Sequence, residues 1–397
     1  MPPPRWCVLT HAPRLDPVTA TLDDEAPVRS SPGAVSWGVA ERTAEWVGSR
    51  NGPPPGYDRL ALQEEFEELT VRAEELVGEE TGLWSPSGPA RARVTDRPGW
   101  VHANVASFQR LVGPHLDRLD PAARLTPSNQ FASLATSSLA GAGRVVAGTQ
   151  MGLILGWVST RVLGQYDLLL TEEAVEDQDI VYFVGPNVVA LEQRHGFDTH
   201  QFRLWLALHE VTHRCQFTAI PWMRDYFVSL VDDGLGSLDP DPSRFAEALR
   251  RISEEIRAGR NPLSDNGALG LLASPGQLEG IHRIQALMSL LEGHGDVTMD
   301  RAGAGAIPSA TRFSEVLRQR RNQTRGPARL LQQLFGLEAK MRQYEEGERF
   351  IATVEESGGP ALLERAWRGP DWLPSLAEIR DPPAWISRVG DAAALAT

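Results

Sequence analysis

Apolar residues recur at helical spacing along most of the chain. In the stretch RLALQEEFEELTVRAEELV they fall on one face of a helix, while glutamates form a solvated face on the other. The same spacing predicts a mainly α protein. The helices are expected over 37–49, 58–80, 98–119, 145–160, 221–233, 243–258, 276–300, 311–322, 326–356 and 359–367.

A change of pattern near the middle of the chain predicts a small β element. Tyr166–Leu170 and Asp179–Val184 are short β-branched and aromatic runs on either side of an acidic loop, and we expect them to pair as strands. A short helix then stops at Gly196. Asp198 is the expected N-cap of the next helix, with Gln201 three residues later, and this helix runs through FRLWLALHEVTHRCQF.

Three glycines, Gly148, Gly152 and Gly156, are spaced four residues apart in the apolar segment 145–160. The segment is too short to span a bilayer, which takes about 20 apolar residues, and a buried helix is expected instead. The glycines then leave one helix face bare, so that a neighbouring helix backbone can approach closely. A phosphate-binding role is disfavoured because these glycines lie inside a helix and not in a strand-to-helix turn.

The chain shows no internal repeat and no linker between 35 and 390, which predicts a single domain over 35–390. Residues 1–34, rich in proline and aspartate, form an irregular lead-in, and 391–397 a short tail. The segment DWLPSLAEIRDPPAWISRV is broken by prolines and is expected to wrap over the surface.

Composition narrows the class of protein further. Hydrophobic residues make up 42% of the 397 residues, as in a globular protein with a sizeable core. The net charge of −13 disfavours nucleic-acid binding and docking on anionic membranes. Two cysteines, Cys7 and Cys215, form no disulfide framework, and the N-terminus lacks the apolar stretch of a signal peptide, so the expected location is the cytoplasm. The oligomeric state is left open.

The pentapeptide His209-Glu210-Val211-Thr212-His213 matches the pattern H-E-x-x-H. Residues four apart share a helix face, so the two imidazoles can bind one zinc ion. Glu210 can then take a proton from a water that the zinc acidifies and later protonate the leaving group. Two surface histidines on an ordinary helix are the alternative. The capped helix and the β-rich run just upstream favour the metal site, because metalloproteases with this motif commonly hold an extended peptide on an edge strand.

A third zinc ligand is expected in the segment LEGHGD, which follows an apolar helical run. Glu292 and Asp296 are four apart, so Glu292 can bind the metal while Asp296 hydrogen-bonds a ligating imidazole. His294 is the competing ligand, although in a regular helix it points to roughly the opposite side. Gly293 and Gly295 indicate either a helix end or a close backbone approach. Glu292 is favoured if the helix continues through Gly293.

Three segments, HEVTHRCQF, LLEGHGDVTMD and LEAKMRQYEEGERF, together resemble the zincin-like metallopeptidase type 2 family. The resemblance extends over about residues 35–390 and includes RVLGQYDLLL and VGPN. It implies a zincin-like helical fold, with the small β element next to the active-site helix. Many members are described as hydrolases or as proteins associated with biosynthesis of the deazaflavin coenzyme, so the resemblance supplies no substrate. The second motif is similar in form to that of the thermolysin-like gluzincins, but 78 residues separate His213 from Glu292, far more than in those enzymes.

Two further side chains are weaker candidates. Tyr344 could donate a hydrogen bond to a tetrahedral oxyanion, or simply pack with its hydroxyl at the surface. His294, if it is not a ligand, could serve the same purpose. Cys215 should point away from the zinc as a small buried residue.

The leading interpretation is a zinc-dependent metallopeptidase or amide hydrolase. His209, His213 and Glu292 bind Zn²⁺, Glu210 is the general base, and a peptide or amide is the substrate. The alternative is a non-hydrolytic protein that keeps the fold as a binding or scaffold partner in a biosynthetic pathway. The intact Glu210 favours the enzyme, because zinc binding alone does not need it.

Overall fold

The structure, a computed structural model, groups residues 33–397 into one compact unit. It describes residues 33–119, 130–166, 179–236, 275–322 and 337–395. The predicted helix over 243–258 and nearly all of the predicted lead-in lie outside these ranges. The expected domain boundaries stay a prediction.

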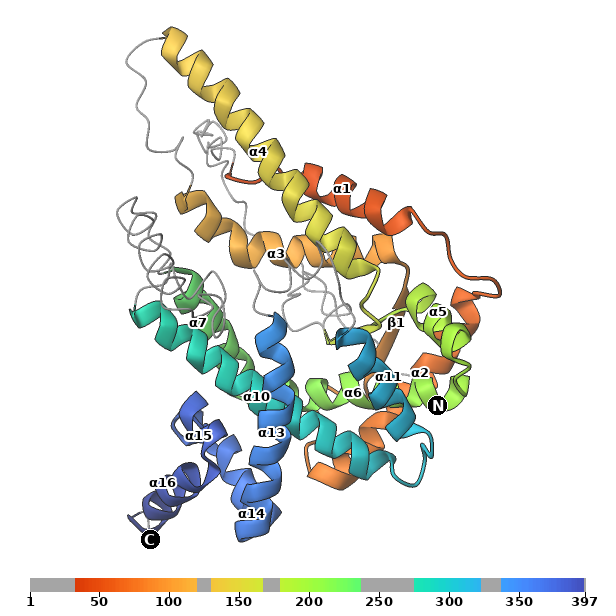
Figure 1. Cartoon of the computed structure of the whole chain (residues 1–397), viewed down its shortest axis with the longest axis vertical. Coiled ribbons are helices and arrows are strands. Elements are labelled where there is room, and N and C mark those ends of the chain that lie inside the picture. Colours follow the sequence, from red (N-terminus) through yellow and green to blue (C-terminus); the bar gives the residue numbers. More distant parts are fainter. Residues whose placement is uncertain (1–32, 120–129, 167–178, 237–274, 323–336, 396–397) are drawn as a thin grey trace, which may run out of the picture. The chain divides into compact units, whose positions relative to one another are not determined.

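Helices make up most of the described chain, which confirms the mainly α prediction (Figure 1). They are α1 (Trp37–Ser49), α2 (Arg59–Thr81), α3 (Arg97–Leu119), α4 (Gln130–Ser159), α5 (Gly185–His195), α6 (Thr199–Ala219), α7 (Met223–Gly236), α10 (Pro275–Gly303), α11 (Ala310–Asn322), α13 (Leu337–Gly358), α14 (Pro360–Leu363), α15 (Leu376–Arg380) and α16 (Pro382–Leu395), with short 3₁₀ helices at Glu364–Arg368 and Pro370–Trp372. In the described ranges, none of them combines the length and apolar character that a membrane span requires.

A three-stranded sheet holds β1 (Arg91–Thr95), β2 (Gly164–Tyr166) and β3 (Ile180–Val184) in the order β1-β3-β2. The central strand β3 is buried along its whole length. It pairs antiparallel with β2 and parallel with β1. The predicted pairing is seen at Tyr166, which lies opposite Val181, and β2 begins two residues earlier than expected. The rest of the predicted strand, 167–170, lies outside the described residues. The strand β1 was not predicted, because its sequence RARVT carries arginines on a mostly polar run.

The main core lies between the sheet and the helices α2 and α6. Phe66 of α2 stacks on Phe183 of β3 with ring centroids 3.9 Å apart, and neither side chain is exposed. Leu208 and Val211 of α6 belong to the same buried cluster. This packing fixes α6, the helix that carries the H-E-x-x-H motif, along its buried face.

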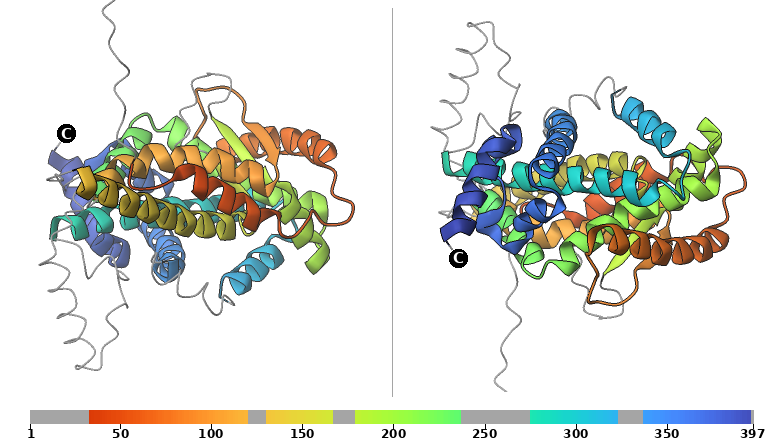
Figure 2. Two further views of the ribbon diagram at one scale, coloured as in Figure 1. Left: turned by 90° about the horizontal axis from the view of Figure 1, so that it is seen from above. Right: turned by 90° about the horizontal axis from the view of Figure 1, so that it is seen from below.

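The glycine stripe of α4 lies against α1, as its spacing predicts (Figures 1 and 2). A Cβ atom at Gly152 would overlap the carbonyl oxygen of Ala40, and one at Gly156 would lie 2.8 Å from the carbonyl oxygen of Ala44. The two backbones are therefore in contact.

The expectation that this segment is a buried helix is wrong for the other face of α4. Val145, Val146 and Leu153 are 46–56% exposed. The helices α1 and α3 pack on α4, and these three side chains lie away from the buried cluster that the three helices share.

The C-terminal segment also differs from its prediction. It folds into α15 and α16, and Ile379, Trp385 and Val389 are fully buried in a core shared with Phe350 of α13. The indole of Trp385 donates a hydrogen bond to the carbonyl of Trp372 at 2.9 Å. Pro382 starts α16 and Ser375 caps α15, and both helices pack on α13 instead of lying loosely over the surface.

A candidate metal centre

The helix α6 presents the two histidines of the motif side by side. Its N-terminus is capped by Asp198, whose carboxylate accepts a hydrogen bond from the backbone N–H of Gln201 at 2.9 Å, as predicted. The rings of His209 and His213 lie 4.8 Å apart at an interplanar angle of 82°. Trp205, one turn earlier, stacks on His209, so the histidine pair continues an aromatic row along this helix face.

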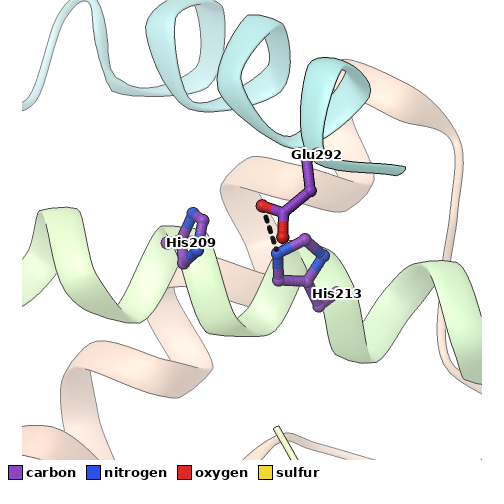
Figure 3. Close-up of side chains that lie close together, drawn as sticks. All are labelled: His209, His213 and Glu292. Atoms are coloured by element: carbon purple, nitrogen blue, oxygen red, sulfur yellow. Dashed lines mark ion pairs between the residues drawn. The ribbon is translucent and has the colours of Figure 1, made fainter. Parts of the chain in front are cut away.

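The helix α10 brings Glu292, which lies 79 positions after His213 in the sequence, to the same place (Figure 3). The Nε2 atom of His213 lies 3.6 Å from the Oε2 atom of Glu292, which is 4% exposed. One ligand atom each from His209, His213 and Glu292 fall within 4.8 Å of one another. The structure thus gathers the three predicted ligands from two helices.

The helix α10 continues without a break past Gly293, which is the condition under which Glu292 was expected to face the histidines. A Cβ atom at Gly293 would lie 2.7 Å from the backbone nitrogen of Glu348, and one at Gly347 would lie 3.1 Å from the Cα of Gly293. Of the two alternatives, the structure shows the close backbone approach at Gly293, between α10 and α13.

His294 points elsewhere. Its Nδ1 atom lies 3.0 Å from the side-chain nitrogen of Gln216, and its ring meets the edge of Trp367. Burial lowers the pKa of His294 to about 4, so the ring is neutral. Among the described residues, the group that could hold a metal ion does not include it.

The carboxylate of Glu210 lies against the strand β2. Its Oε2 atom accepts a hydrogen bond from the backbone N–H of Tyr166 at 3.0 Å. A Cβ atom on Gly164 would lie 2.7 Å from its Cγ and 2.8 Å from its Oε1. The edge strand therefore holds the predicted base in a defined orientation.

Buried charges anchor α6 on its far side. Arg214 is fully buried and pairs with Asp179 and Glu74, each at 2.7 Å. Burial lowers the pKa of this guanidinium, but the two carboxylates outweigh it and raise the pKa above its ordinary value. Burial, together with Asp179, also raises the pKa of Tyr166. The residues next to the motif are thus held by α2, β2 and the start of β3.

His213 is the most strongly perturbed group of the centre. Burial lowers its pKa, but the hydrogen bond and the charge of Glu292 more than offset this and raise it to about 9. Without a metal, His213 is therefore protonated at neutral pH and paired with Glu292.

The donor set suits zinc. Two imidazoles and one carboxylate form a ligand set of catalytic zinc sites, which leave the fourth position open. Donor atoms on a tetrahedral zinc are about 3.4 Å apart, close to the 3.6 Å between His213 and Glu292.

The remaining predicted residues are placed as follows. Asp296 lies one turn beyond Glu292 on α10 and is half-buried, and its expected bond to a ligating imidazole stays a prediction. Tyr344 belongs to α13, but its side chain lies outside the described part of the chain. Cys215 is fully buried, as expected, and burial raises its pKa to about 12, so its thiol is unreactive.

Two residues of the centre were not predicted. Gly164 carries no pattern of its own, because its importance comes from a contact with a side chain 46 positions away. Gln216 lies three residues after His213 on α6, and that spacing was available as a clue, since residues three apart are neighbours on a helix.

Comparisons with known proteins agree with this geometry. A family model described as zincin-like metallopeptidase matches residues 35–386. A crystal structure described as a putative hydrolase with a novel fold from Chloroflexus aurantiacus is similar, with a TM-score of 0.64 and 29% identity. The match covers 90% of this chain and 99% of that one. No curated protein matches the chain. None of these matches bears on deazaflavin-coenzyme biosynthesis, and that association stays a prediction.

Proposed function

This chain belongs to the zincin-like metallopeptidase family, and from that premise we propose that it is a zinc-dependent peptidase or amide hydrolase. The observation that carries the proposal is the meeting of His209, His213 and Glu292 beside the buried carboxylate of Glu210. The family and the similar hydrolase support hydrolysis. A metal site beside a carboxylate base is suited to the hydrolysis of an amide bond.

Each residue has a distinct task in this proposal. His209, His213 and Glu292 hold the ion, which supplies a Lewis acid that acidifies water and polarises a carbonyl group. Glu210 accepts the proton of the attacking water and passes it to the leaving amine. The N–H of Tyr166 holds one carboxylate oxygen of Glu210, so the base does not have to be oriented at the moment of reaction.

The strand β2 gives the substrate a place to bind. Among the described strands it lies at the edge of the sheet, and its residues contact Glu210. An extended peptide can pair with such an edge through its backbone, which brings a scissile carbonyl close to the base. A peptide or a peptide-like amide is therefore the substrate class that we propose.

The test is cleavage of a peptide library by the zinc-loaded protein beside its Glu210→Gln variant. The variant should keep zinc, because Glu210 is not a ligand, and should lose turnover by on the order of 10³-fold or more. The matched control is Glu68→Gln, the same chemical change at an exposed position of α2, which should retain full activity.

Two outcomes would contradict the proposal. Full activity of Glu210→Gln would place the chemistry elsewhere. A wild-type protein that binds zinc and cleaves neither peptides nor simple amides would favour the non-hydrolytic alternative, a binding or scaffold protein that keeps the fold.

A further inference from the structure

One fully buried amide, Gln216, joins the two helices of the metal centre. Its Oε1 atom lies 2.9 Å from the Nδ1 atom of His213. Its Nε2 atom lies 2.9 Å from the carbonyl oxygen of Leu291 and 3.0 Å from the Nδ1 atom of His294. Both ends of the amide are therefore engaged, one on α6 and one on α10.

The carbonyl of Leu291 determines which way this amide points. A backbone carbonyl only accepts hydrogen bonds, so the amide atom facing it must be the NH₂ group. The NH₂ group then donates its second proton to His294, and the oxygen is left facing His213. The orientation follows from this hydrogen-bond network alone.

The orientation of the amide in turn fixes the tautomer of His213. An amide oxygen accepts and does not donate, so the Nδ1 atom of His213 must carry a proton. In the neutral ring the lone pair then lies on Nε2, the atom that is 3.6 Å from Glu292. This is the nitrogen that faces the other two donors.

We propose that Gln216 is a positioning residue that holds His213 in its Nε2-binding tautomer and ties it to α10 next to Glu292. The proposal rests on the metal site of the proposed function. Gln216 does not touch the ion itself. It acts on two of the proposed metal ligands at once, because it binds His213 directly and binds Leu291, which immediately precedes Glu292.

The physical gain is pre-organisation of the ligand. A second hydrogen bond on a ligating imidazole fixes its ring and raises its basicity, and loss of such a partner typically costs about 10- to 100-fold in metal affinity. The usual partner is a carboxylate, a backbone carbonyl or water. Here an amide takes that place, and its other end is bound to the second ligand helix.

The experiment measures Zn²⁺ affinity by competition with a chromophoric chelator. Gln216→Met keeps the length of the side chain and removes every hydrogen bond, and it should weaken zinc binding about 10- to 100-fold. Gln216→Glu keeps an acceptor for His213 but loses the NH₂ group that binds Leu291, so its zinc affinity should lie between those of Gln216→Met and the wild type. The matched control is Thr218→Val on the same helix, which loses only a bond to the carbonyl of Arg214 and should bind zinc as wild type does.

A second measurement covers the case in which Gln216→Met does not fold. In zinc-loaded, ¹⁵N-labelled wild-type protein, His213 should show a slowly exchanging proton on Nδ1 and a metal-bound Nε2. A metal-bound Nδ1, or a folded Gln216→Met variant with wild-type affinity, would overturn the proposal. Equal losses in the Met and Glu variants would overturn it too, since the acceptor would then be irrelevant. A wild-type protein that takes up no zinc would instead refute the metal site itself.

Discussion

At the scale of single residues, the centre depends on the protonation of His213. Its pKa of about 9 in the metal-free protein comes from Glu292, which outweighs the opposite effect of burial. A metal ion binds only the neutral imidazole, so it has to displace a proton at any pH below that value. In the proposed function, zinc and the proton would therefore compete for His213.

We predict from this that zinc affinity rises with pH by about tenfold per unit between about pH 7 and pH 9, and levels off above. The sign follows because the displaced proton is already absent above the pKa. Chelator competition at three pH values measures the slope. In Glu292→Gln the carboxylate that raises the pKa is gone, so the slope over this range should flatten. A wild-type affinity independent of pH would contradict the prediction.

The residues of the motif could be identified from the sequence, because their chemistry depends on a spacing of four along one helix. The choice of Glu292 over His294 also followed from helical spacing. Gly164 could not be found in this way, since its partner Glu210 lies 46 positions away. The spacing of Gln216 from His213 was a clue, but its second partner, Leu291, lies 75 positions away and only the folded chain brings the two together.

At the scale of elements, the strand β2 lies against the proposed base Glu210 at Gly164. We predict that Gly164→Ala lowers turnover by up to about 10²-fold, because the new Cβ would displace Glu210 from its orientation. Zinc affinity should change little, as no donor is touched. The control is Gly52→Ala, where a Cβ meets nothing within 4 Å. Wild-type kinetics of Gly164→Ala would show that the strand does not hold the base.

The contact between α1 and α4 gives a stability prediction. Gly152→Ala should lower the free energy of unfolding by about 1–3 kcal/mol, because its Cβ would overlap the carbonyl of Ala40. Gly143→Ala, on the same helix, meets nothing within 4 Å and should stabilise by about 0.5–1 kcal/mol. Denaturant unfolding measures both. Shifts of equal sign would contradict the predicted backbone contact.

Helices were the elements best predicted, because each keeps its apolar period over several turns. The strand β1 could not be predicted, because its five residues include two arginines and show too little alternation of apolar and polar positions. The burial of the C-terminal segment could not be predicted for a different reason. Trp385 is buried by packing against Phe350 of α13, a long-range contact that no local pattern indicates.

At the scale of the whole molecule, the metal donors join two helices that are distant in sequence. A ligand that binds only the folded state stabilises it, by about 4 kcal/mol at a free concentration 1,000 times its Kd. We predict that zinc raises the unfolding temperature and that Glu292→Gln removes most of this shift. The control is Glu279→Gln, an exposed position of the same helix. Equal zinc-induced shifts in wild type and Glu292→Gln, measured by calorimetry, would contradict the role of Glu292.

The family could be anticipated at this scale because short segments spread over most of the chain pointed to one fold, and the family match covers residues 35–386. The path of the chain between the two motifs could not be predicted from the sequence. Seventy-eight residues of mostly helical pattern fit many arrangements, and only tertiary packing places α10 over α6.

The backbone contact between Gly293 and Gly347 has a consequence for which ions the protein can select. The carboxylate of Glu292 is carried by α10, and touching backbones at Gly293 and Gly347 block any movement of this helix toward α13. With Glu292 on a helix held in this way, the donor set would not widen in that direction for a larger cation such as Ca²⁺, which requires six or more oxygen ligands at longer distances. Discrimination by ionic radius would then originate in two glycines that never approach the ion.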